Sequence, residues 1–186
     1  ASSFYRVAMA CKSAAYRFGL SATPWRDDGE DMLLEAALGP KLSDTNCSYL
    51  ISQGYLVRPQ IHMKSVQTVH ESNFKGRDYQ DIYRELIVEN HKRNRVIAIQ
   101  AGQWAGSGLS VLILVNQVRH GEILLPSLPN AEFIHGSISG ENRKNALKRL
   151  EQKLQPVMIA TTLADEGLDI PTLDVLILAG GGKSAT

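Results

Sequence analysis

Residues 111–160 read VLILVNQVRH GEILLPSLPN AEFIHGSISG ENRKNALKRL EQKLQPVMIA, and this stretch decides the fold. Short apolar runs alternate here with helical patterns, and the alternation continues toward the end of the chain. The apolar runs lie at 111–115, 131–134, 157–160 and 175–178, and the helical patterns lie at 118–125 and 141–153. Strands that are apolar on both faces and alternate with helices are typical of a parallel sheet with helices on both sides. The sequence therefore predicts an α/β fold with right-handed crossovers.

The chain before residue 111 has a less regular pattern. Apolar spacing predicts helices near 4–15, 30–38, 48–53, 78–89 and 91–105, and strands at 16–20 and 61–68. Residues 40–58 lose strong periodicity and are interpreted as a connector. Because this connector divides the strand at 16–20 from the others, we expect that strand to belong to a separate sheet.

The composition excludes several classes of protein. With 20 Lys plus Arg against 19 Asp plus Glu, the net charge is +1, which rules out a surface that is basic all over and binds nucleic acid unspecifically. Any contact with phosphate must therefore come from local clusters of charge and from backbone amides. The longest apolar runs, such as 111–115, are far shorter than the roughly 20 residues needed to cross a bilayer, and no membrane span is expected. Cys11 and Cys47 are too few for a disulfide scaffold or a zinc site, which indicates a reducing compartment.

Each apolar run leads into a loop of small or polar residues. The first loop starts at Ser21, and the later ones start at Asn116, His135, Thr161 and Gly180. Because the carboxyl ends of parallel strands open on one edge of a sheet, we expect the last four loops to meet at that edge, the usual ligand site of an open α/β fold. We also expect Asn116 and Ser139 each to cap the helix that follows, and for Asn116 the alternative is contact with the phosphate backbone of a bound strand.

Four segments resemble motifs of superfamily 2 helicases, the relatives of the DEAD/DEAH-box proteins. Residues 19–24, Gly-Leu-Ser-Ala-Thr-Pro, resemble the Ser-Ala-Thr motif, and residues 111–116 resemble motif IV. Residues 133–136, Phe-Ile-His-Gly, together with Arg143 resemble the His-Gly segment, and residues 160–171 resemble motif V, the most specific of the four. The motifs follow the family order and spacing. Their detail resembles the DNA-repair and restriction-subunit branch more than the RNA-directed DEAD-box branch.

The resemblance implies a RecA-like motor fold in two parts. Residues 1–57 would be the C-terminal remnant of a first motor domain with its connector, and residues 58–186 a second motor domain that ends before motif VI. The intact parent would be an ATP-dependent DNA helicase or translocase that uses ATP and Mg²⁺. Its partners would be nucleic acid, expected to be DNA, and the missing portion of the first motor domain, with no membrane involved. Such a protein would be cytoplasmic, at a nucleoid or a site of viral replication, or nuclear in a eukaryote.

The resemblance also implies a role for each motif residue. Nucleic-acid contact is expected from the strand-end loops and from one helix, through His135, Gly136, Arg143, Thr161 and Thr162. Hydroxyl groups, backbone amides and arginine side chains are groups that bind a phosphate chain. The ribose side of ATP is expected at Gly167 and Asp169. Nucleotide state is expected to be coupled to domain movement by Ser21, Ala22 and Thr23.

Structural explanations stay open for the same residues. Asp165, Glu166 and Asp169 are also explained as turn and capping carboxylates. His135 is also explained as a hydrogen-bonded structural histidine. Basic residues crowd the helical pattern at 141–153, and such charge runs are also typical of a solvated helix face. They are Arg143, Lys144, Lys148, Arg149 and Lys153.

Several family elements are missing from the sequence. No Gly-Lys-Thr phosphate loop and no Asp-Glu pair for Mg²⁺ precede Ser21, and the chain stops before the arginine-bearing motif VI. No catalytic residue and no metal ligand are therefore expected, and the chain alone is expected to lack ATPase activity. The alternative is a non-catalytic nucleic-acid-binding module with a degenerate motor fold. A small P-loop kinase or ATPase built on 182–184 is disfavoured, because Ile177 stands where such a loop needs a glycine.

Overall fold

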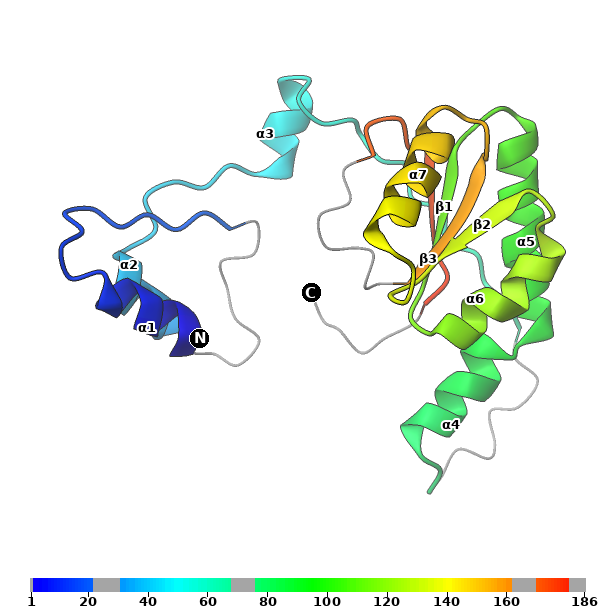
Figure 1. Ribbon diagram of the computed structural model, residues 1–186, viewed down its shortest axis with the longest axis horizontal. Helices are drawn as coiled ribbons and strands as arrows, with labels where there is room; N and C mark the ends of the chain where they lie inside the picture. The colour runs from blue at the N-terminus through cyan, green and yellow to red at the C-terminus, as the bar shows by residue number, and fades with distance from the viewer. Residues whose placement is uncertain (1, 22–30, 68–75, 162–169, 181–186) are drawn as a thin grey trace. The chain divides into compact units, whose positions relative to one another are not determined.

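The computed structural model describes residues 2–21, 31–67, 76–161 and 170–180 (Figure 1). The chain divides into two compact units, Ala1–His62 and Met63–Thr186. The described part of the first unit is helical, and the described strands all belong to the second.

Helices form the regular structure of the first unit. They are α1 (Ser2–Ala10), α2 (Asp31–Leu38) and α3 (Cys47–Ser52). α1 and α2 lie against each other (Figure 1). Gly39 follows α2 with φ at +87°, a left-handed conformation that favours glycine and ends the helix. α3 is capped by Asn46, whose side chain accepts a hydrogen bond from the Tyr49 amide at 2.8 Å.

The predicted strand at 16–20 is wrong. Residues 16–20 belong to no strand, and Tyr16, Phe18 and Leu20 are exposed. The rings of Tyr16 and Phe18 stack on each other with their centroids 6.4 Å apart. A strand needs a neighbour to pair its backbone groups, and the described part of this unit supplies none. The separate sheet that we expected is therefore not found among the described residues.

The second unit alternates helices and strands. Its elements are α4 (Tyr79–Tyr83), the π-helical turn η1 (Arg84–Val88), α5 (His91–Gly106), β1 (Val111–Val115), α6 (Val118–Leu124), the 3₁₀ turn η2 (Leu125–Ser127), β2 (Ala131–Ile134), α7 (Gly140–Glu151), β3 (Val157–Thr161) and β4 (Val175–Leu178). β1, β2 and β4 have the predicted bounds, and β3 is one residue longer than predicted. The prediction of a strand at 61–68 is wrong over its described residues, 61–67, which belong to no strand. Ile61 and Met63 are exposed there.

The four strands form one parallel sheet in the order β2-β3-β1-β4. β1 lies between β3 and β4, with Val115 opposite Thr161 on one side and Leu114 opposite Leu178 on the other. β2 and β4 are the edge strands of the described sheet. The predicted α/β class with a parallel sheet is confirmed.

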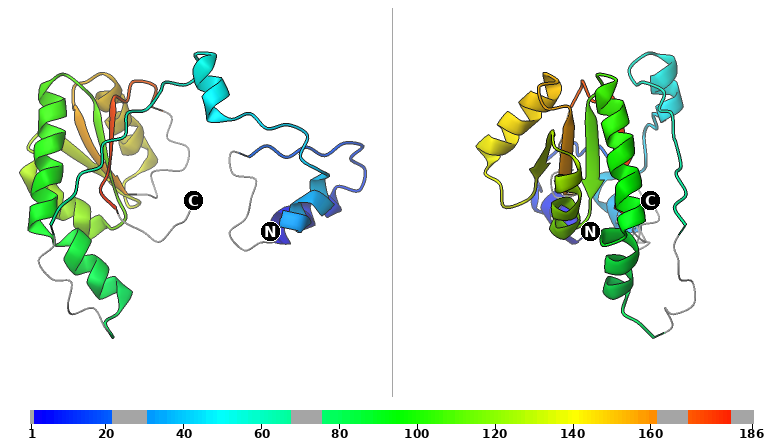
Figure 2. Two further views of the ribbon diagram at one scale, coloured as in Figure 1. Left: turned by 180° about the vertical axis from the view of Figure 1, so that it is seen from behind. Right: turned by 90° about the vertical axis from the view of Figure 1, so that its right-hand side faces the viewer.

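Helices cover both faces of the sheet, α5 and α6 on one face and α7 on the other (Figure 2). Because successive side chains of a strand point to opposite faces, Ile113 belongs to the α5–α6 core, whereas Leu112 and Leu114 belong to the α7 core. Cover is incomplete over β4, where Leu176 and Leu178 share the α7 face but are 50% and 69% exposed. Within the described ranges, the predicted two-sided cover therefore holds for the central strands and is incomplete at this edge.

A buried hydrogen-bonded pair joins α6 to α5. His120 is fully buried, and its Nε2 lies 2.9 Å from Oδ1 of Asn94. Asn94 Nδ2 donates to the Val88 carbonyl at 2.8 Å, so its Oδ1 accepts and His120 Nε2 carries the proton. Burial first, and then the charge of Arg93, lower the pKa of His120 to about 4.

We expect the free energy of unfolding to fall as the pH drops from 6.5 toward 4. Histidine in the unfolded chain binds its proton near the ordinary histidine pKa of 6.5, whereas folded His120 stays neutral until about pH 4. The unfolded chain therefore takes up the proton first, and the stability lost across this window is at most about 3 kcal/mol. Urea unfolding followed by circular dichroism across this pH range measures the loss. His120→Gln is expected to flatten the pH dependence and the exposed His91→Gln to keep it, so equal slopes would contradict the assignment.

Candidate functional site

The carboxyl ends of the four strands lie along one edge of the sheet, because all of them run parallel. The register sets the end of β3 beside the end of β1, and Ile134 at the end of β2 beside Ala160. Asn116 directly follows β1 and His135 directly follows β2, Thr161 is the last residue of β3, and Gly180 is the second residue after β4. These four positions meet at one edge, as the topology predicts, and they define the carboxyl edge.

Gly180 lies directly against the side chain of Asn116. A Cβ atom on Gly180 would lie 2.7 Å from Cγ and 3.1 Å from Nδ2 of Asn116, and closer still to its Oδ1. Glycine at this position therefore allows Asn116 to occupy its place on the carboxyl edge. The expectation that Asn116 caps the next helix is wrong, because α6 begins at Val118 and its N-cap residue is Gln117.

Three buried polar atoms near the carboxyl edge have no hydrogen-bond partner in the described part of the chain. They are Oγ1 of Thr161, Nδ1 of His135 and Nε of Arg143. A buried polar atom without a partner costs free energy, so natural proteins rarely keep one without a reason. These atoms come from β3, from the loop after β2 and from α7, and all three residues were predicted to bind nucleic acid. Within the described residues, hydrogen-bonding capacity is therefore left unused at this edge of the sheet.

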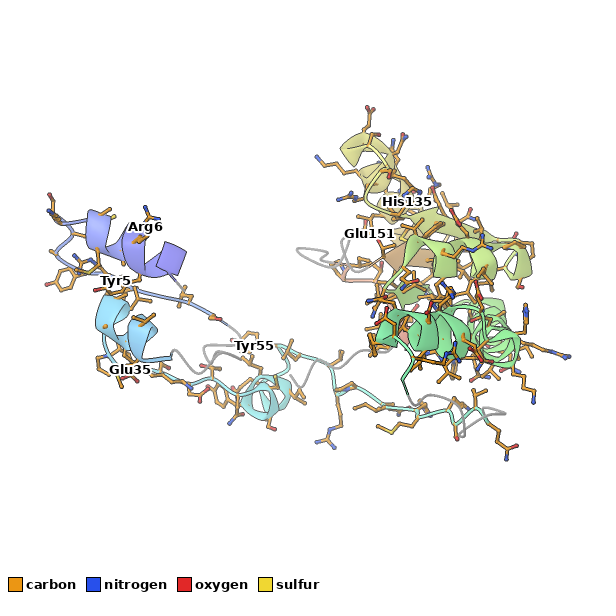
Figure 3. All side chains as sticks on the ribbon, turned by 90° about the horizontal axis from the view of Figure 1, so that it is seen from below. Tyr5, Arg6, Glu35, Tyr55, His135 and Glu151 are labelled. Atoms are coloured by element: carbon orange, nitrogen blue, oxygen red, sulfur yellow. The ribbon has the colours of Figure 1, made fainter. Side chains whose placement is uncertain are left out.

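The position of His135 is set by packing against β2. Its ring centroid lies 5.0 Å from that of Phe133, with the two rings tilted by 43°, and His135 is labelled in Figure 3. The Phe133 ring in turn lies against Gly121 of α6. Because Nδ1 of His135 makes no hydrogen bond in the described structure, the contacts of this residue do not support the alternative of a fully hydrogen-bonded structural histidine.

The basic residues of α7 and its end fall into two groups. Arg149 donates from Nε to Glu132 at 3.1 Å and also from Nη2, and Lys153 Nζ lies 2.9 Å from Oδ2 of Asp174. The other three make no ion pair among the described residues, and they are Arg143, Lys144 and Lys148. Ser139 caps α7 as predicted, since its Oγ accepts from the Asn142 amide at 3.3 Å. Only part of the predicted basic cluster is therefore available to a phosphate.

Lys153 belongs to a polar cluster at the opposite end of the sheet. Oδ2 of Asp174, just before β4, accepts from the Ser110 amide at 2.9 Å and from Lys153. The Ser110 hydroxyl lies 2.5 Å from the Thr172 carbonyl. The backbone hydrogen bond from Ser110, followed by the one from Lys153, holds the pKa of Asp174 below its usual range. In the same way, the hydrogen bond with Glu132 raises the pKa of Arg149. The pair of Lys153 and Asp174 joins the end of α7 to the start of β4, and the pair of Arg149 and Glu132 joins α7 to β2.

Several predicted site residues lie outside the described residues. They are Ala22, Thr23, Thr162, Gly167 and Asp169, together with Asp165, Glu166 and the segment 182–184. Ser21 is described and exposed, in the first unit, and Gly136 is exposed in the loop after β2. Within the described ranges, no group of three His, Cys, Asp or Glu side chains could hold a metal ion. None of the described helices is both long and apolar enough to cross a membrane.

A cleft of about 580 Å³ opens between β2 and α7, beside the carboxyl edge. β2 contributes Glu132 and Ile134 to its lining, and the loop at 137–139 contributes its three residues. The wall on the α7 side is formed by Asn142, Asn145, Ala146 and Arg149. This cleft was not predicted. The only signal for it in the sequence is the spacing of those four residues, which sets them on one face of a helix.

Comparison with known proteins identifies the family of this fold. Residues 81–185 match the family described as the helicase conserved C-terminal domain. The chain belongs to this helicase family. Its RecA-like α/β fold and its place among superfamily 2 helicases, both predicted from the motifs, are confirmed.

Relatives of this helicase domain are much longer proteins. It is 28% identical over 182 residues to a protein provisionally named helicase 22 of Sulfolobus islandicus filamentous virus (isolate Iceland/Hveragerdi), a match that covers 90% of this chain and 33% of the relative. It is 32% identical over 161 residues to the pre-mRNA-splicing ATP-dependent RNA helicase prp28 of Schizosaccharomyces pombe, covering 83% and 22%. The crystal structure of T4 UvsW matches with 26% identity and a TM-score of 0.50, covering 59% of this chain and 23% of that one. The helicase domain thus spans a third or less of each relative.

Proposed function

We propose that this chain is part of an ATP-dependent DNA helicase or translocase. In this proposal residues 58–186 form the second motor domain and residues 1–57 the end of the first, a division close to the two compact units of the structure. The observation that carries the proposal is the set of unpartnered polar atoms on Thr161, His135 and Arg143 at the edge of a helicase-family sheet. The missing part of the first motor domain would be its partner.

The carboxyl edge offers the groups that bind a phosphate chain. The Thr161 hydroxyl and the Arg143 guanidinium are donors of the kind that phosphate oxygens accept, and the backbone amide of Gly136, an exposed residue in the loop after β2, is a third. Contacts to phosphate fix the position of a strand without reading its sequence, which is what a motor that moves along a strand requires. The preference for DNA follows from the resemblance of the motifs to the DNA-repair and restriction-subunit branch.

ATP enters the proposal through the motif resemblance. Gly167 and Asp169 would lie at the ribose of ATP, and Ser21, Ala22 and Thr23 would couple nucleotide state to domain movement. Phosphoryl transfer needs Mg²⁺, a lysine that cradles the phosphates and an arginine that offsets developing charge. The sequence holds none of these in recognisable form, so the purified chain is expected to release no phosphate from ATP, with or without DNA. DNA-stimulated turnover would refute this part of the proposal.

Arg143→Ala is expected to weaken binding of single-stranded DNA about tenfold and to reduce the dependence of affinity on salt, because one phosphate contact is lost. The measurement is fluorescence anisotropy of the full chain with a labelled oligonucleotide at several salt concentrations. Arg95→Ala is the matched control, since Arg95 is exposed on α5, on the opposite face of the sheet from α7. Equal losses in both variants, or tighter binding of RNA than of DNA of the same sequence, would contradict the proposal.

A further inference from the structure

The cleft between β2 and α7 is neutral and rich in unused hydrogen-bonding groups. Its two charged side chains, Glu132 and Arg149, neutralise each other through their paired hydrogen bonds. The side-chain amides of Asn142 and Asn145 make no hydrogen bond within the described structure, and the Ser137 hydroxyl makes none either. Ile138 and Ala146 add apolar surface. A phosphate, which carries charge, has no counter-charge in this cleft.

A ligand for this cleft is uncharged, with donors and acceptors at its rim and apolar faces. The volume of about 580 Å³ lies within the range of roughly 300–1000 Å³ that is typical of small-ligand sites. Asparagine amides pair with the edges of nucleobases, and a base turned out of its stack is read by such groups. A nucleobase therefore matches the cleft in charge and hydrogen bonding, and the cleft has ample room for one.

The cleft also opens where a nucleobase would be delivered. Ser137 lies two residues after His135 and one after Gly136, the residues proposed to hold the phosphate chain. Asn142 in the cleft wall precedes Arg143, whose Nε is one of the unpartnered atoms at the carboxyl edge. A strand held by its phosphates at that edge thus places a neighbouring base at the mouth of the cleft.

We infer that the cleft between β2 and α7 is a base-binding subsite, which takes one nucleobase of a single strand held at the carboxyl edge. The inference rests on the proposed function, because the strand must first be bound by its phosphates. Asn142 and Asn145 hydrogen-bond to the base edge. Glu132 holds the planar guanidinium of Arg149, which lines the cleft, in one orientation.

Abasic oligonucleotides separate base binding from phosphate binding. A single-stranded oligonucleotide and an abasic one of equal length carry the same phosphates, so a base-binding subsite predicts about tenfold weaker binding of the abasic strand by the full chain. Asn145→Leu, at an exposed position on α7, is expected to weaken binding of the intact strand by a similar factor and to leave binding of the abasic strand unchanged. Gln152→Leu is the matched control, because this exposed amide follows the same helix outside the cleft.

The outcomes of this experiment test the base-binding subsite and the proposed nucleic-acid interface separately. If the chain binds neither strand, the proposed nucleic-acid interface is wrong. If it binds both strands equally, or if Asn145→Leu weakens both by one factor, the interface stands and the base-binding subsite is wrong. Arg143→Ala is expected to weaken both strands together, because it removes a phosphate contact. Thermal unfolding followed by circular dichroism confirms that each variant is folded.

Discussion

Gly121→Ala is expected to lower the free energy of unfolding by about 2 kcal/mol, even though alanine is the better helix former. Gly121 is buried in α6, and a Cβ atom there would lie 2.9 Å from Cε1 of Phe133 and closer still to the rest of the ring edge. Phe133 cannot retreat easily, because it packs against the α5–α6 core and against the His135 ring. The added methyl group must therefore separate α6 from β2.

Gly102→Ala supplies the matched control for this substitution. Gly102 lies in α5, is exposed, and has no atom within 4 Å of the place its Cβ would take. The same change is expected to stabilise the chain there by as much as about 1 kcal/mol, through helix propensity alone. Urea unfolding at neutral pH measures both variants. Stabilisation by Gly121→Ala would show that α6 and β2 do not pack as closely as the structure has them.

Strands could be predicted from the sequence where the neighbouring sequence also predicts the helix and strand that pack beside them. β1 and β2 have the predicted bounds because each apolar run is followed by a helical pattern that returns the chain to the same sheet. The segments at 16–20 and 61–68 have a similar local pattern but lack a partner strand in the described structure. Local pattern therefore predicts a strand only where the surrounding sequence also provides its neighbours.

Some features of the candidate site could likewise be predicted from the sequence, and others could not. The topology alone predicts that Asn116, His135, Thr161 and Gly180 meet, because parallel strands share one carboxyl edge. Charge could not show which basic residues of α7 are free, since the partners of Arg149 and Lys153 lie 17 and 21 residues away in sequence. The cleft was missed for a related reason. It exists only because one face of α7 lies opposite the edge strand β2, and no pattern within either element reports that contact.

Gly180→Ala is expected to weaken binding of single-stranded DNA about tenfold, or about 1.4 kcal/mol, without lowering the free energy of unfolding. The Cβ atom of alanine would overlap the end of the Asn116 side chain, and the end of a flexible side chain is the part that moves aside. The rotated side chain would no longer lie on the carboxyl edge beside Thr161. The loss is therefore expected in affinity, measured by fluorescence anisotropy, and not in the urea midpoint.

A double-mutant cycle tests whether Gly180 acts through Asn116. If it does, Asn116→Ala weakens binding by about the same factor as Gly180→Ala, and the double variant is no weaker than either single variant, because the two changes remove one contact. Gly106→Ala is the matched control, since Gly106 ends α5 and has open space where its Cβ would lie. Additive losses in the double variant would mean that Gly180 contributes through its own backbone. A fall in stability equal to the fall in affinity would mean that the glycine supports the sheet and not the position of Asn116.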